Sequence, residues 1–183
     1  MANSRAPCGA DPYRAEPYRA EPGQIGTAGN GTAVTLAAMT PEAAGVLGTG
    51  LAAIDPWARV NYSPARLANF FATREDGAQR YQVIVAGHLA GTIVVRNPWL
   101  AGPYLNLLGL LPGFSGRGIG HLALSWFEAE ARHAKARNIW LCVSSFNTGA
   151  ERFYRAHGFE RSANLADLTS DGFDEILMRK RLA

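Results

Sequence analysis

The chain has little lysine and little cysteine, and it lacks any long apolar run. Arginine supplies nearly all of the cations, because Lys135 and Lys180 are the only lysines. The net charge is +3 without a basic run or stripe, so nucleic acid is not expected as a main partner. No apolar span of about 18 residues and no apolar segment behind a charged start are found, which argues against a transmembrane helix and a signal peptide. We expect a soluble, cytoplasmic protein without a membrane partner.

The two cysteines, Cys8 and Cys142, form neither metal-binding nor redox spacing, so we predict a reduced compartment and no metal. With 183 residues, 48% of them hydrophobic, the chain is long enough for one domain with a substantial core. We predict that this domain spans residues 33–183. Residues 1–32 carry the tandem pentapeptide YRAEP at 13–17 and 18–22 and too few aliphatic side chains for a core. They are predicted to form a flexible leader, with an arm that docks on a neighbouring subunit as the alternative.

Hydrophobic periodicity and capping residues predict an α+β domain. Helices are expected from Thr40-Pro41 to about Ile54, from Ser63-Pro64 over ARLANFFATR, after Gly120 to about Arg137, and from Asn147 to Gly158. Strands are expected at 34–39, 80–86, 89–95, 105–111, 139–145, 159–163 and 174–181. Gly87-His88 predicts a hairpin turn between the strands at 80–86 and 89–95. Asn97-Pro98 is expected to end the second of these strands.

The most informative stretch is LNLLGLLPGFSGRGIGH, residues 105–121. An apolar strand ends at Pro112, three glycines follow at alternate positions, and a helical pattern then begins. The first turn of a helix offers unpaired N–H groups and positive potential, and glycines let a ligand approach the backbone closely. The stretch therefore predicts a phosphate-binding turn, with a plain turn between core elements as the alternative.

Two common phosphate-binding motifs do not fit this turn. A Walker A motif needs Lys and then Ser/Thr after its last glycine, whereas Ile119 follows Gly118. The dinucleotide fingerprint needs G-x-G-x-x-G and an acidic residue about 20 positions later, and neither is present. Leu110-Leu111-Pro112 with Arg117-Gly118-Ile119-Gly120 instead resembles the cofactor motif of the GNAT superfamily of acyl-CoA-dependent N-acyltransferases. Ser115 stands where that motif has Arg or Gln.

A second motif supports the same resemblance. Many GNAT relatives read Asn-x-x-Ala-x-x-Phe/Leu-Tyr-x-x-x-Gly-Phe after the strand that follows the cofactor helix, and residues 147–159 match this pattern from Asn147 to Phe159. The resemblance covers about residues 33–182. It implies a splayed, mixed and mostly antiparallel sheet of six to seven strands with about four helices. It also places the chain distantly near the ribosomal-protein alanine N-acetyltransferases.

The resemblance implies acetyl-CoA as the co-substrate and assigns residues to it. The backbone around Leu108, Gly109 and Leu110 would pair with the pantetheine arm. The pyrophosphate would be held by the turn, and Asn147 would contact the CoA arm. Tyr154 would protonate the departing thiolate, with simple packing beside Phe153 as the alternative. The residues of the turn are Ser115, Gly116, Arg117, Gly118, Ile119, Gly120 and His121.

No general base can be assigned from the sequence. Relatives carry Glu either on the strand before the turn, where Asn106 stands here, or early in the next strand, where Cys142 stands. The residues that could form the acceptor site are, in chain order, Asp55, Trp57, Arg59, Tyr62, Trp99, Tyr104 and Asn106. Asp55 could attract a cationic amine, whereas Trp57 is expected mainly to pack under a helix.

The sequence thus predicts an N-acetyltransferase that moves acetyl from acetyl-CoA to a primary amine by direct attack in a ternary complex. The acceptor would be a small molecule, a peptide or a protein, and longer acyl groups stay open. One alternative is a catalytically weak GNAT-fold module that senses or binds CoA. Another is an interaction protein that uses its leader. A homodimer is compatible with the family.

Overall fold

The computed structural model describes residues 22–182, in which one eight-stranded sheet is flanked by four helices. Residues 1–21 of the predicted leader, with nearly all of its tandem pentapeptide, lie outside the described residues. The helices are α1 (Pro41–Ala52), α2 (Pro64–Ala72), α3 (Ile119–His133) and α4 (Thr148–Ala156). The strands are β1 (Gln24–Thr27), β2 (Ala33–Ala38), β3 (Ala78–Val85), β4 (His88–Trp99), β5 (Gly102–Leu110), β6 (Asn138–Ser144), β7 (Glu160–Ser170) and β8 (Phe173–Arg181).

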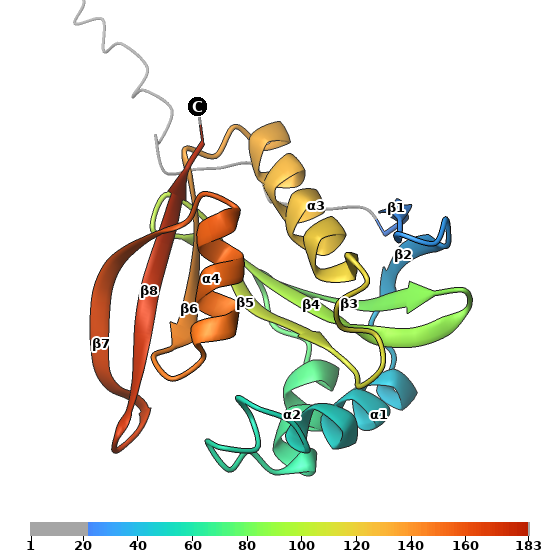
Figure 1. Cartoon of the computed structure of the whole chain (residues 1–183), viewed down its shortest axis with the longest axis horizontal. Coiled ribbons are helices and arrows are strands. Elements are labelled where there is room, and N and C mark those ends of the chain that lie inside the picture. The colour runs from blue at the N-terminus through green and yellow to red at the C-terminus, as the bar shows by residue number, and fades with distance from the viewer. Residues whose placement is uncertain (1–21, 183) are drawn as a thin grey trace, which may run out of the picture.

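The sheet has a helical layer on each face. α1 and α2 lie against one face, and α3 and α4 lie against the other (Figure 1). The larger core packs α3 and α4 on the sheet and includes Phe127 and Phe159, both fully buried. The smaller core packs α1 and α2 on the opposite face and includes Leu47 and Phe71. The predicted α+β architecture with four helices is confirmed.

The strand order is β1-β2-β3-β4-β5-β6-β8-β7, and only the β5–β6 pair is parallel. The sheet is therefore mixed and mostly antiparallel, as predicted. It has eight strands, however, rather than six to seven. The additional strand is β1, which pairs antiparallel with β2 inside the range predicted as leader. The sheet consequently begins at Gln24 and not near Ala33, because a short edge strand can form backbone hydrogen bonds without alternating apolar side chains.

The helices begin where their capping residues predict. The side chains of Thr40 and Ser63 accept hydrogen bonds from the third following N–H, and a proline occupies the first helical position in each case. Asn147 caps α4 in the same way through Ala150 N–H. Gly158 follows α4 with φ of 83°, the left-handed conformation that favours glycine at a helix end.

Three predicted boundaries are wrong. α3 ends at His133 and not near Arg137, since Lys135 turns the chain with φ of 56°. β4 continues past Asn97 to Trp99, with an irregular register between Arg96 and Trp99 that accommodates the proline. β7 runs from Glu160 to Ser170 instead of ending at Ala163. Its side chains are exposed on both faces, so it lacks the apolar alternation that marks a strand in a sequence.

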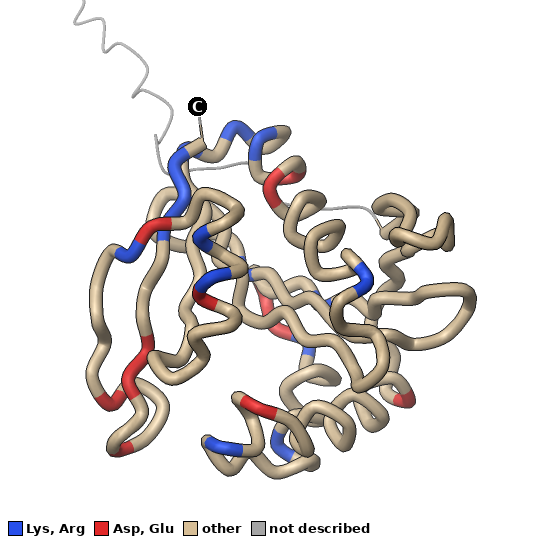
Figure 2. The backbone as a smooth tube through the Cα atoms, in the orientation of Figure 1, with Lys and Arg blue, Asp and Glu red and all other residues tan. Residues whose placement is uncertain are grey.

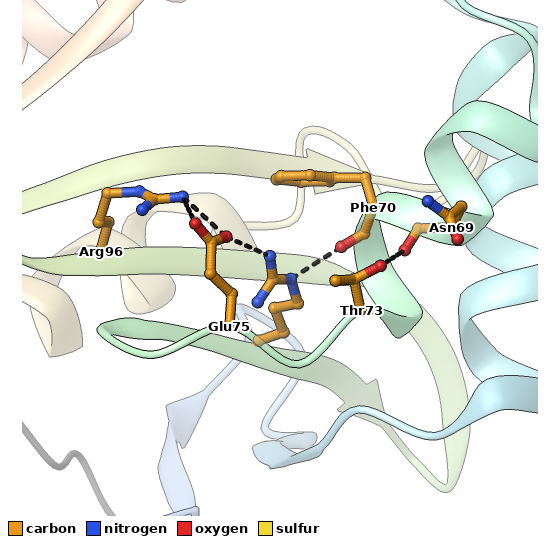
Figure 3. A network of polar contacts seen from close by, with 6 residues as sticks. Asn69, Phe70, Thr73, Glu75 and Arg96 are labelled. Carbon is orange, nitrogen blue, oxygen red and sulfur yellow. Dashed lines mark hydrogen bonds and ion pairs between the residues drawn. The ribbon is translucent and has the colours of Figure 1, made fainter.

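A polar network fixes the connection from α2 to β3 (Figure 3). Both Glu75 carboxylate oxygens accept hydrogen bonds from Arg96 Nη2 at 2.8 Å. Arg80 donates to Glu75 and, through Nε, to the Phe70 carbonyl at 2.8 Å. The hydrogen bonds from Arg96, joined by those from Arg80, hold the pKa of the Glu75 carboxyl below its usual value. Among the described residues no helix is both long and apolar enough to cross a membrane.

Candidate active site

The two halves of the sheet meet at a short parallel junction. Within the described chain, β5 and β6 pair only at Tyr104–Trp140 and Leu105–Leu141. Beyond these residues β5 remains paired with β4, and β6 remains paired with β8. The two central strands therefore diverge, which confirms the splayed sheet, and the β5 backbone after Leu105 lacks a neighbour on its β6 side.

A bulge in β5 lies next to this divergence. Val94 pairs with Leu107 and Val95 pairs with Leu105, so Asn106 is the extra residue. Leu105 and Leu108 both face the α3 core, whereas Leu107 faces the α1–α2 core. The bulge thus reverses the alternation of side chains at the point where the strand begins to diverge.

A cleft of about 370 Å³ occupies the divergence. On one side of the sheet it reaches Ala150 and Tyr154 of α4. On the other side it reaches Trp57, Tyr62 and Arg66 around the start of α2. Because α4 and α2 lie on opposite faces of the sheet, the cleft passes through the sheet at the splay.

The predicted phosphate turn lies between β5 and α3. Gly116 and Gly118 have φ of 75° and 79°, conformations in which a side chain would be strained. Gly118 is the N-cap of α3 and has no side chain to accept from the first N–H groups of the helix. Atoms at the Cβ positions of Gly116 and Gly118 would meet nothing within 4 Å. The turn is consequently an exposed cradle of backbone donors at a helix N-terminus, suited to an anion.

Charged and polar side chains border the cradle. Ser115 and Arg117 are exposed, and the Arg117 guanidinium lies over the Phe114 ring, 5.7 Å from its centroid. His121 Nδ1 lies 2.6 Å from His157 Nε2. His157 Nδ1 donates to the Phe153 carbonyl at 2.8 Å, so a single chain of hydrogen bonds links the start of α3 to the end of α4.

Tyr154 and Asn147 line the cleft from α4 and its N-cap. The Tyr154 side chain is 8% exposed and makes edge contacts with Phe153 and Phe159. Burial raises the pKa of the Tyr154 hydroxyl, so it keeps its proton near neutral pH. Packing and proton donation are compatible at this position, because the ring contributes to the core while the residue also borders the cleft.

Some of the acceptor-site candidates line the cleft, whereas Asp55 does not. Asn106, Tyr62 and Trp57 line the cleft. Trp57 also packs on the backbone of β5, where its Cη2 would be 2.8 Å from a Cβ at Gly109. Asp55 is not among the cleft-lining residues of the described chain, and its exposed side chain lies 3.9 Å from Arg59.

A polar row that the sequence did not reveal crosses the cleft. Ser144 on β6 pairs with Glu175 on β8, and Ser144 Oγ donates to Glu175 Oε1 at 2.6 Å. Glu175 is 7% exposed, and burial raises the pKa of its carboxyl. Burial also raises the pKa of the Cys142 thiol, which is hydrogen-bonded to Tyr104. Alternation within IWLCVSS and DEILMRKR hinted at one shared face, but the pairing of β6 with β8 could not be read from the sequence.

Comparison with known proteins identifies the family. The model of the acetyltransferase (GNAT) family matches residues 50–159. Among curated proteins none matches the chain. Similar solved structures include nourseothricin acetyltransferase, at 24% identity and a TM-score of 0.54 over 59% of this chain and 67% of that one.

Two further structures share the fold over more of the chain. The ribosomal-protein-S18-alanine N-acetyltransferase of Escherichia coli is 19% identical, with a TM-score of 0.65 over 82% of this chain and 94% of that one. A GNAT family acetyltransferase of Elizabethkingia anophelis with acetyl-CoA bound is 16% identical, with a TM-score of 0.60 over 81% and 98% of the two chains. The family match, the splayed sheet and the glycine turn agree, and the chain belongs to the GNAT family of acetyl-CoA-dependent acetyltransferases.

Proposed function

We propose that this acetyltransferase transfers the acetyl group directly to a primary amine while both substrates are bound. The observation that carries this proposal is the passage of the cleft through the sheet. A cleft that is open toward both faces lets a thioester approach from the α3–α4 side and an amine from the α1–α2 side. The two substrates can then meet at the splay without a covalent enzyme intermediate.

The residues present fit CoA. The β5 backbone around Leu108, Gly109 and Leu110 lies beyond the junction with β6, so it can pair with the extended amides of a pantetheine arm as with an added strand. The N-terminus of α3 would hold the pyrophosphate through Gly118, Ile119 and Gly120 N–H groups. Ser115, Gly116, Arg117 and His121 lie around that position, and Asn147 borders the cleft at the α4 N-cap.

Tyr154 is proposed as the proton donor to the departing thiolate. Its raised pKa keeps the hydroxyl protonated, and its place in the cleft is on the α4 side, where the CoA arm would lie. A thiolate that leaves a tetrahedral intermediate is a better leaving group when a donor neutralises it. The same hydroxyl is shielded from bulk water, which favours a direct hydrogen bond to sulfur.

The acceptor side is bordered by aromatic and charged groups. Tyr62 and Trp57 provide apolar surface, and Arg66 places its guanidinium over the Tyr62 ring at 4.3 Å from the centroid. Asn106 contributes from the bulge. Asp55 lies outside this wall, so we do not assign it to acceptor binding.

Titration calorimetry and initial-rate kinetics test the proposal. We expect saturable binding of acetyl-CoA and free CoA and no binding of NADH. A panel of primary amines and peptides with free N-termini should include acceptors that release CoA thiol, with intersecting double-reciprocal plots when both substrates are varied. Parallel plots would contradict the ternary complex. CoA binding without thiol release across the panel would contradict catalysis and favour a CoA-sensing module.

A further inference from the structure

The acceptor side of the cleft contains a buried carboxylate that the reaction scheme above does not use. Glu175 lies on β8, is 7% exposed, and lines the cleft together with Ser144 and Cys142. We infer that Glu175 is the general base that takes the proton from the incoming amine. This inference rests on the proposed function.

Strand register places Glu175 on the α1–α2 face of the sheet, from which the amine would approach. Leu141, Val143, Ile176 and Met178 belong to the core on the α3–α4 side. The residues that alternate with them, Cys142 and Ser144 on β6 and Glu175 on β8, therefore face the α1–α2 side. The carboxylate thus lies on the face opposite α4, where the amine would approach, while Tyr154 lies on the thiol side.

Hydrogen bonding orients the carboxylate. Ser144 Oγ donates to Oε1 at 2.6 Å, which fixes one oxygen. The other oxygen can then accept from an ammonium group in the cleft. Asn106 and Cys142 occupy the two positions at which the sequence offered no carboxylate, so Glu175 supplies from a third strand what those two positions lack.

The surroundings of Glu175 favour a pKa above that of an exposed glutamate. Burial raises the pKa of Glu175, whereas the Ser144 hydrogen bond lowers it. The charged and titratable groups that line the same cleft from the other elements are Tyr62 and Arg66 at α2, Tyr104 on β5, Cys142 on β6 and Tyr154 on α4. Among the lining residues of the described chain Arg66 is the only cation, and its guanidinium is over the Tyr62 ring.

The part of the β7–β8 hairpin around Glu175 carries only negative charge. Residues 162–178 include Asp167, Asp171, Asp174 and Glu175 and contain neither lysine nor arginine. Figure 2 shows acidic and no basic positions in the half of the β7–β8 hairpin that leads to its turn. Leu168 and Thr169 of the same hairpin line the cleft. Such a field attracts an amine in its ammonium form, which must lose a proton before it can attack.

The proton balance closes with these two residues. The ammonium passes one proton to Glu175, and the neutral nitrogen forms the C–N bond to the thioester carbon. The C–S bond then breaks, the thiolate takes up a proton from Tyr154, and the Tyr154 oxygen regains one from the acylated nitrogen. Glu175 releases its proton to solvent, so the products are the amide, the CoA thiol and one proton. No oxidant or further reactant is needed.

Glu175→Gln keeps the size of the side chain and removes its basicity. We expect kcat/KM for the amine to fall by about 10²–10⁴-fold, with the acidic limb of its pH profile lost. The acetyl-CoA Kd measured by calorimetry should stay close to that of the wild type. Ser144→Ala removes the hydrogen bond that lowers the Glu175 pKa, so the acidic limb should move to higher pH. Glu160→Gln, an exposed carboxylate on β7, is the matched control and should leave the profile unchanged.

Each outcome has a distinct meaning. A Glu175→Gln variant that keeps the wild-type rate and acidic limb overturns the inference. A reduced rate with the limb still in place also overturns it, because that pattern indicates a structural role only. A wild-type protein that binds acetyl-CoA and acetylates no amine overturns the proposed function, and this failure is visible before any variant is made.

Discussion

Gly102 at the start of β5 lies directly against the carbonyl of Asn138 at the start of β6, so that a Cβ at Gly102 would overlap this oxygen. The contact lies next to the Tyr104–Trp140 pair, where the two halves of the sheet are joined. The close approach at this end and the divergence at the other end together create the cleft. The absence of one side chain therefore determines how closely the central strands meet.

Gly102→Ala should separate the strands at this point. We expect a loss of about 1–3 kcal/mol of unfolding free energy, as for other insertions into packed positions. Urea denaturation followed by circular dichroism measures the change. Gly29→Ala is the control, because a Cβ there would meet nothing within 4 Å. Equal stability of the two variants would show that the junction tolerates wider spacing.

Gly118→Ala tests the phosphate turn. The left-handed φ of 79° at Gly118 costs alanine about 1–2 kcal/mol, and the strain would shift the backbone N–H groups that form the anion cradle. CoA affinity should fall by about tenfold or more, equivalent to about 1.4 kcal/mol. Gly172→Ala has a similar φ of 81° in the β7–β8 turn. It should show the conformational cost without the loss of affinity, and calorimetry distinguishes the two variants.

Tyr154→Phe tests the proton donor. The ring contacts with Phe153 and Phe159 remain, so the thermal unfolding temperature should change little. The rate constant kcat should fall by about 10²–10⁴-fold with little change in acetyl-CoA affinity. Tyr81→Phe removes the hydroxyl of another buried tyrosine, which donates to Gln79, and should leave kcat intact. Full turnover by Tyr154→Phe would exclude the acid role.

Glu175 should make stability depend on pH in a direction opposite to most carboxylates. Its pKa is raised in the folded state, so its favourable contribution is complete below the unfolded value of about 4.3 and is lost as pH rises through the folded value. Glu175→Gln should therefore gain stability relative to the wild type as pH rises from about 4 toward neutral. Thermal unfolding at several pH values measures the difference. A stability difference between Glu175→Gln and the wild type that does not change with pH would contradict a raised pKa of Glu175.

Glu75 should behave in the opposite way. Its pKa is lowered by Arg96 and Arg80, so its contribution is present above the unfolded pKa and is lost as pH falls through the folded value. Glu75→Gln should lower the unfolding temperature at neutral pH and have little effect under strongly acidic conditions. Asp76→Asn changes the next carboxylate and serves as the control.

Sequence patterns predicted the elements whose determinants are local. Thr40-Pro41 and Ser63-Pro64 marked helix starts because capping depends on neighbouring residues. β7 was predicted too short because its side chains face solvent on both sides, and only Leu165 is partly covered. β1 was missed because an edge strand needs backbone partners more than an apolar pattern.

At the candidate active site, too, the residues with local determinants were predictable and those that depend on distant partners were not. The glycine turn and the Tyr154 motif are contiguous in sequence, so both could be recognised before the structure was known. Glu175 was not recognised, because its importance depends on pairing with Ser144, 31 positions away in the chain. A strand register is a property of two segments and of the turn between them, and no local pattern contains it.

The two-pair junction between β5 and β6 has a mechanical consequence. The two halves of the sheet, β1–β5 and β6–β8, are joined within residues 22–182 only by the pairs Tyr104–Trp140 and Leu105–Leu141. A molecule bound along the side of β5 that lacks a neighbouring strand would hold the two halves together. Amide exchange from Asn106 to Leu110 should then be slower in the enzyme with CoA bound than in the free enzyme. The force needed to pull the two halves of the sheet apart should rise when CoA binds and fall when it leaves.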